Sequence, residues 1–148
     1  MASTSTKRII LPTLLLAMVL VLGLSSGCTK DKLVDKAEDF VIFLIVDNNW
    51  IVTNFTEGGA NITAQFSGYE YDFHRDWKVT AIKSGQLEVN GTWSANSSAQ
   101  TITSNFPQGI DLLQKFNGTW NIDKTTMASV DASRTTNGVA YQLSLRKK

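Results

Sequence analysis

Three segments of the chain alternate apolar and polar side chains at every second residue, and this pattern constrains the fold more than any other feature. Residues 68–74 (GYEYDFH) alternate aromatic with charged side chains, and residues 87–93 (LEVNGTW) and 139–146 (VAYQLSLR) alternate apolar with polar ones. A period of two places successive side chains on opposite faces of a strand. Each segment therefore predicts a half-buried strand, and the folded part of the chain is expected to be all-β.

Weaker strand candidates and turn residues fill the intervals between these segments. The weaker candidates are residues 50–55, 62–66, 78–83, 101–106, 119–124 and 128–131. Short turns rich in Gly, Asn and Ser separate them, and residues 107–116 carry apolar side chains at the spacing of a short helix. Short connections favour a meander, and closure into a barrel hides its apolar face and removes its edge strands. A two-sheet sandwich is the alternative, although sandwiches commonly use longer Greek-key crossings.

The amino terminus has the anatomy of a lipoprotein signal peptide. Lys7 and Arg8 precede an apolar run over residues 9–24, and the small residues Ser26 and Gly27 stand directly before Cys28. We expect a signal peptidase to recognise Ser26, Gly27 and Cys28 and to cut directly before Cys28. Residues 1–27 are then removed, and Cys28 carries a lipid. At the third position before the cysteine, bacterial lipoproteins usually have Leu, whereas this chain has Ser25. Ordinary secretion and an uncleaved anchor are the alternatives.

The mature chain is expected to be one nearly neutral domain without cysteine chemistry. Removal of residues 1–27 from the 148 leaves 121 residues, with 12 basic against 13 acidic side chains. That length suits a single core, and the charge argues against nucleic-acid binding. Because Cys28 is the only cysteine, disulfides and Cys-based metal sites are excluded.

Residues 28–47 are expected to form a tether that turns into a short N-terminal helix, and residues 48–148 the barrel domain. The tether begins with closely spaced charged residues. From Leu33 to Ile45, apolar residues recur at three-and-four spacing, as in an amphipathic helix. The competing interpretation makes residues 40–46 a buried strand, and periodicity cannot separate the two over so short a run.

Five aromatic side chains are the candidates to line the barrel. Tyr69, Tyr71 and Phe73 share one face of a strand, and burying each ring is worth about 1.5–3 kcal/mol. Burying the alternating Glu70 or Asp72 unpaired would cost several kcal/mol by comparison, so the aromatic face is expected to point inward. The repeated tetrapeptide at residues 90–93 and 117–120 (NGTW) adds Trp93 and Trp120 as core residues or as a shared binding platform.

The order of these motifs resembles the small lipocalin-like lipoproteins of Bacteroidota. The resemblance is carried by Trp50, Thr63, residues 66–69 (FSGY), Phe73, the two GTW motifs at 91–93 and 118–120, and the last strand at 143–147. Two departures stand out. True lipocalins carry Gly-x-Trp on the first strand, where this chain has NNW at 48–50, and such relatives often have a glycine where this chain has DWK at 76–78. The resemblance implies an eight-stranded antiparallel up-and-down barrel that can bind a ligand, with no catalytic residues to transfer.

Catalysis is not expected. His74 is the only histidine, so every catalytic triad or Cys-His pair would need it. It shares its strand face with Glu70 and Asp72, which would permit an acid/base or metal cluster, but such a pattern is also typical of a solvent-exposed face. We therefore predict no metal and no cofactor. Trp77, at an expected hairpin tip, is a candidate for an exposed contact with a carbohydrate or partner, or for folding back over the barrel mouth.

Together these features predict a monomeric, lipid-anchored cell-envelope protein, held in the outer membrane on either its periplasmic or its surface side. The primary functional hypothesis is non-catalytic binding of a small apolar or amphipathic ligand. The alternative is a filled barrel that binds an envelope protein or glycan through its loops, because an eight-stranded barrel has room only for its own side chains or one small ligand.

Overall fold

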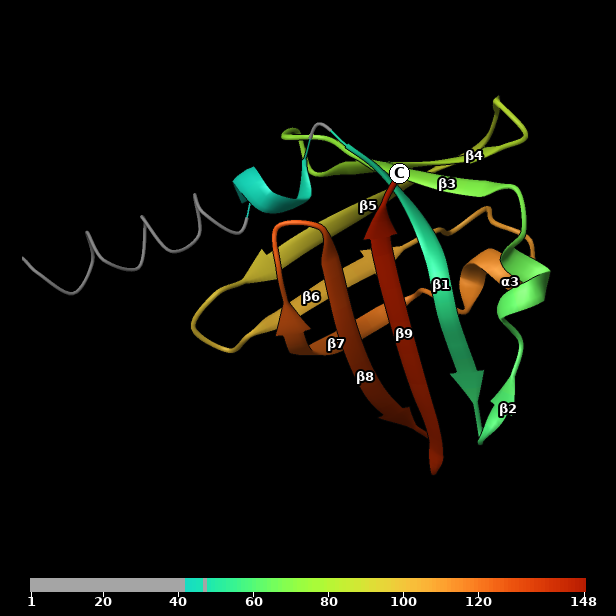
Figure 1. Ribbon diagram of the computed structural model, residues 1–148, viewed down its shortest axis with the longest axis vertical. Coiled ribbons are helices and arrows are strands. Elements are labelled where there is room, and N and C mark those ends of the chain that lie inside the picture. The colour runs from blue at the N-terminus through green and yellow to red at the C-terminus, as the bar shows by residue number, and fades with distance from the viewer. Residues whose placement is uncertain (1–41, 47) are drawn as a thin grey trace, which may run out of the picture. The chain divides into compact units, whose positions relative to one another are not determined.

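Eight antiparallel strands close on themselves in the computed structural model, which describes residues 42–46 and 48–148 (Figure 1). The strands are β1 (Asn49–Glu57), β3 (Tyr69–Phe73), β4 (Lys78–Lys83), β5 (Gln86–Asn96), β6 (Thr101–Asn105), β7 (Gly118–Thr125), β8 (Ser129–Thr136) and β9 (Val139–Lys147). A two-residue strand, β2 (Ala60–Asn61), pairs with the end of β1. Consecutive barrel strands are neighbours, and β9 pairs with β1 from Trp50↔Lys147 to Glu57↔Tyr141. The predicted eight-stranded up-and-down barrel is confirmed.

The pleat of each strand sorts its side chains as the alternating sequence predicts. In β3, Tyr69, Tyr71 and Phe73 are buried while the residues between them are half-buried. In β4, Val79 and Ala81 are buried and the two terminal lysines are exposed. The barrel interior is therefore built from every second residue of each strand, because neighbouring residues point to opposite faces.

Residues 42–45 are helical, which decides between the two interpretations of this segment for the part that is described. Val46 N donates to Ile42 O at 2.9 Å, closing one helical turn. Leu44, Ile45 and Val46 are buried, whereas Phe43 is 60% exposed. The turn thus presents an apolar side to the barrel, and we call residues 42–46 the plug segment. The predicted signal peptide, Cys28 and the tether up to residue 41 lie outside the described residues.

The strand predicted at residues 62–66 is wrong. Only Ala60–Asn61 is extended there, and Thr63–Phe66 forms a 3-10 helix, η1. The cause is local: Asn61 Oδ1 accepts the Thr63 amide at 2.9 Å, and Thr63 Oγ1 accepts the Phe55 amide at 2.8 Å. Side chains of Asn and Thr that bond nearby amides in this way compete with a strand ladder. The turn directs Phe66 into the core.

The two ends of the barrel differ in what covers them. At one end, which we call the N-terminal mouth, lie the plug segment and the hairpin turns at residues 74–77, 97–100 and 126–128. At the opposite, distal end lie η1 and the short helix α3 (Asp111–Gln114), which falls within the helix expected at residues 107–116. Figure 1 shows the helical turn of the plug segment and α3 on opposite sides of the barrel.

The two NGTW tetrapeptides need their glycines for different reasons. A Cβ on Gly91 would lie 2.5 Å from Asn105 O, at the end of β6, and 2.7 Å from the ring of Phe106, the first residue of the β6–β7 connection, so these segments approach β5 too closely for a side chain. Gly118 has a φ of +112°, which favours glycine. The tryptophans that follow, Trp93 and Trp120, are both buried.

Candidate functional site

The barrel interior is nearly filled by its own side chains. One cavity of about 40 Å³ lies at its centre. It is lined by Ile45, Trp50, Phe73, Ile102, Ser104, Phe116, Trp120, Val130, Ala132, Leu143 and Leu145. Sites for drug-sized ligands commonly have about 300–1,000 Å³. The described barrel thus has no central cavity of the kind that would enclose such a molecule.

The five predicted lining residues are all buried but take different places in the core. Phe73 and Trp120 line the central cavity. Tyr69 and Tyr71 stack with ring centroids 6.3 Å apart, and Tyr71 also contacts Phe116 at 4.7 Å. Trp93 packs edge-on against Phe73 at 5.5 Å. Trp120 contacts a different set of rings, so the two NGTW tryptophans do not form one platform.

A second and larger cavity, which we call the mouth pocket, opens at the N-terminal mouth. Its volume is about 130 Å³, and it lies between the plug segment and the ends of β5 to β8. Its lining residues are Leu44, Ile45, Asn96, Ser97, Gln100, Thr101, Ile122, Thr125 and Val130. The aliphatic members supply an apolar wall, and the amide and hydroxyl side chains supply a neutral polar rim. This pairing suits an amphipathic guest.

The polar rim of the mouth pocket contains an unused hydrogen-bonding group. The Ser97 hydroxyl oxygen is buried and has no hydrogen-bond partner. In the same turn, Gln100 has a φ of +52°, which is uncommon for a residue with a side chain. Its carbonyl accepts the Ile122 amide at 2.8 Å, which fastens the turn to β7. An unsatisfied buried hydroxyl is costly, and Ser97 is one of the residues that line the mouth pocket.

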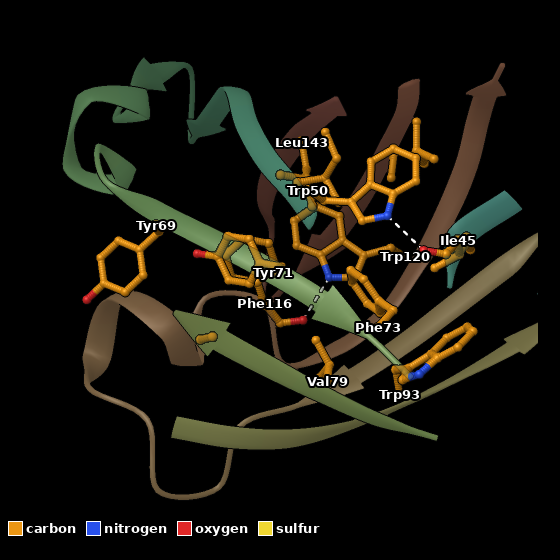
Figure 2. Packing of buried hydrophobic residues seen from close by; sticks show 14 of the residues in the cluster. Ile45, Trp50, Tyr69, Tyr71, Phe73, Val79, Trp93, Phe116, Trp120 and Leu143 are labelled. Carbon is orange, nitrogen blue, oxygen red and sulfur yellow. Dashed lines mark hydrogen bonds between the residues drawn. The ribbon is translucent and has the colours of Figure 1, made fainter. Parts of the chain in front are cut away.

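The plug segment forms the wall between the two cavities. Ile45 and Val130 line both the central cavity and the mouth pocket. Figure 2 shows the Trp50 indole pointing at the backbone of Ile45, and its Nε1 donates to Ile45 O at 2.8 Å. This bond is buried, so it holds the plug segment firmly against the barrel.

The outer face of β3 and β4 carries the acidic residues and the histidine, and each has ordinary partners. His74 Nε2 lies 3.1 Å from Thr80 Oγ1 and 3.7 Å from Asp72 Oδ2. Glu70 accepts hydrogen bonds from Lys148 at 2.7 Å and from Asn49 at 2.9 Å. The Lys148 bond, then the Asn49 bond, lowers the pKa of the Glu70 carboxyl. Among the described residues no three His, Cys, Asp or Glu side chains gather into a metal site.

Trp77 is both half-exposed and folded back. Its side chain remains 42% exposed, and its ring tilts against buried Trp93 with centroids 5.1 Å apart. The residue has a φ of +65°, and its carbonyl accepts the Trp93 amide at 2.9 Å. Holding a bulky residue in this backbone region costs free energy. The hairpin at residues 74–77 therefore fixes an indole at the edge of the N-terminal mouth.

Two buried polar groups mark the distal half of the core. Burial raises the pKa of the Tyr71 hydroxyl, which has no hydrogen-bond partner. Arg134 donates from Nη2 to Lys115 O at 2.8 Å and from Nη1 to Asn117 O, and it lies 4.5 Å from the Trp120 ring centroid. Burial lowers the pKa of this guanidinium. Arg134 thereby fastens the β6–β7 connection to the barrel, a structural role.

Several residues of the mouth pocket carry no signal in the sequence. Ser97 and Gln100 stand in a stretch that reads only as a turn, and their contribution depends on the plug segment, about 50 residues away in the chain. Ile45 could be identified as apolar but not as a wall between cavities. The buried aromatic residues of β3, by contrast, can be identified in the sequence because they alternate with charged residues.

Comparison with known proteins adds one structural likeness. No family model and no curated protein matches the sequence. A crystal structure of a DUF4847 family protein from Bacteroides vulgatus ATCC 8482 is similar, with 14% sequence identity and a TM-score of 0.49. The likeness covers 70% of this chain and 95% of that one.

Proposed function

We propose that this chain is a lipid-anchored, non-catalytic protein of the cell envelope whose barrel binds a small amphipathic ligand at its N-terminal mouth. The mouth pocket carries the proposal, because it combines an apolar wall with a buried, unpartnered Ser97 hydroxyl. Its volume of about 130 Å³ sets the size of the apolar group. An engineered apolar cavity of about 150 Å³ holds one benzene. The ligand therefore inserts a short chain or a single ring and leaves its polar part at the rim.

Binding of hexan-1-ol tests the mouth pocket. This probe has one short apolar chain and one neutral polar group, and we expect a Kd on the order of 1 mM, since small ligands gain limited free energy per atom. Amide NMR shifts should change at residues 96–101 and 122–130. Thr125→Trp, at the exposed edge of the mouth pocket, should block these shift changes. Thr136→Trp, at the distal end, should leave them intact. Shifts that persist in Thr125→Trp would place the probe elsewhere and contradict the proposal.

Lipidation at Cys28 is tested separately. We expect the wild-type chain, expressed in a bacterial host with its signal peptide, to incorporate labelled palmitate and to fractionate with the envelope membranes. Cys28→Ala removes the thiol that would carry the lipid and should lose the label, while Ser25→Ala should keep it. Incorporation that survives Cys28→Ala would show that the anchor is not at this cysteine. Among the described residues, no helix is long and apolar enough to cross a bilayer.

A filled barrel that presents its loops to an envelope protein or a glycan is the second candidate. The small central cavity of about 40 Å³ favours it, since most of the interior serves packing alone. Native mass spectrometry of the protein purified from its own host distinguishes the two candidates. A co-purifying small molecule supports the ligand-binding function, and a consistently empty barrel that retains a macromolecular partner supports the second.

A further inference from the structure

Three large apolar side chains are exposed together at the N-terminal mouth. Phe43 of the plug segment is 60% exposed, Trp77 of the β3–β4 hairpin 42%, and Met127 of the β7–β8 hairpin 70%. They come from three separate segments of the chain, and the strand register brings those segments to one end of the barrel. Asn49 pairs with Asp72 at the end of β3, and Lys147 N bonds Ala128 O beside Met127. We call these three residues the apolar rim.

The apolar rim lies at the end from which the chain leads toward Cys28. Residues 29–41, 13 in number, connect Cys28 to the first described residue, and a chain of this length reaches at most about 45 Å when fully extended. A barrel strand such as β9, with nine residues, is itself about 30 Å long. A lipid on Cys28 is therefore attached through the side of the N-terminal mouth, and the connection would have to run back along the barrel for the distal end to meet the membrane.

The chemistry of the apolar rim suits the boundary between lipid headgroups and acyl chains. Tryptophan is enriched at this boundary because its ring is apolar and its N–H is polar. Asp76 and Lys78 are the sequence neighbours of Trp77 and pair with each other, with Lys78 Nζ 2.6 Å from Asp76 Oδ2. Long basic side chains such as Lys78 can lay their stems along apolar surface while their charges stay in water. Exposed apolar side chains that stand singly need no explanation, but three on the end from which the chain leads toward Cys28 do.

We infer that the apolar rim is a membrane-contact surface that seats the N-terminal mouth on the bilayer to which Cys28 attaches the protein. This inference rests on the proposed lipid anchor. It gives the mouth pocket a direct route to the membrane, because Leu44 of the plug segment, next to Phe43, lines that pocket. An amphipathic ligand would then pass between bilayer and pocket without crossing water.

Tryptophan fluorescence of the lipidated protein in phosphatidylethanolamine and phosphatidylglycerol vesicles tests the inference, with lipids brominated in the upper part of their acyl chains as short-range quenchers. Trp77 is the exposed one among the described tryptophans, because Trp50, Trp93 and Trp120 are buried. We expect brominated lipids to quench a component that Trp77→Phe removes. Moving the indole within the apolar rim, as Trp77→Phe with Met127→Trp, should restore the quenching.

The matched control moves the indole to the distal end. Leu87 is 61% exposed near the β4–β5 turn, so Trp77→Phe with Leu87→Trp should show no quenching. Equal quenching of indoles placed at positions 87 and 127 overturns the inference. So does the absence of quenching at both positions in a protein that carries its lipid, and in that case the apolar rim would be a surface for a protein partner. Absence of palmitate on Cys28 is a different failure, that of the anchor. In that case the unlipidated chain at high vesicle concentration still decides whether the apolar rim enters lipid.

Discussion

Phe73→Ala should lower the free energy of unfolding by about 3–5 kcal/mol, the range for truncating a buried phenylalanine. The ring is only 7% exposed, it packs edge-on against Trp93, and it lines the central cavity. Its removal would enlarge a void that is already present, and the surrounding strands are hydrogen-bonded on both sides and have little freedom to collapse into the space. Denaturant midpoints at unchanged m-value measure the loss.

His74→Ala, the neighbouring substitution, should change stability by less than about 0.5 kcal/mol, as exposed substitutions do. The side chain of His74 is 43% exposed and contacts Thr80 at the surface. The pair of variants therefore compares the two faces of one strand at adjacent positions. If His74→Ala proved the more damaging, the polar face would be the buried one, and Glu70, Asp72 and His74 would become a candidate site.

Gly91→Ala is expected to be nearly as harmful, at about 3 kcal/mol, because forcing extra volume into a packed core strains it. The new Cβ would lie 2.5 Å from Asn105 O and 2.7 Å from a ring carbon of Phe106. Neither neighbour can easily give way. Asn105 O belongs to the β6 backbone, and Phe106 is 1% exposed and packed against Tyr71 and Phe116. Thermal or denaturant unfolding of the purified protein measures the effect.

Gly85→Ala provides the control for adding a methyl group without crowding. Nothing lies within 4 Å of a Cβ built at Gly85, but its φ is +81°. The expected cost is about 1 kcal/mol, that of a left-handed backbone alone. A Gly91→Ala variant no less stable than Gly85→Ala would mean that β5 and the β6–β7 connection are less closely packed than the structure has them.

The barrel could be predicted from the sequence because its strands obey one strong local rule. Tyr69, Tyr71 and Phe73 are large, apolar and spaced by two, so the register that buries them turns their charged neighbours to the outer face, and a slip by one residue would invert the whole strand. The helix at residues 42–45 could not be separated from a strand, because so short an apolar run fits the periodicity of either interpretation. The strand prediction for residues 62–66 failed for a related reason. Phe66 is buried, as in a strand, but it is placed in the core by a turn that Asn61 and Thr63 stabilise.

The mouth pocket could not be predicted, since it exists only where distant segments meet. Ile45, Ser97 and Val130 contribute to it from the plug segment, the β5–β6 turn and β8. None of the three is unusual in its local sequence. What makes Ser97 notable is a missing hydrogen-bond partner, and a partner is a property of the folded chain alone. The exposure of Trp77, in contrast, could be anticipated from the charged residues around it.

The pairing of β1 with β9 has a consequence for how the barrel comes into being. Thr53 Oγ1 donates to Ser144 O across 91 residues of chain, so the closing seam joins the first and the last of the described strands. Contacts so distant in sequence slow folding, and until β9 is present both β1 and β8 have open edges that invite pairing with other chains. Loss of a few carboxyl-terminal residues would thus remove part of the β1–β9 pairing and open the barrel. For a protein that crosses a membrane before it folds, as the proposed export requires, the barrel is completed only after β9 has crossed.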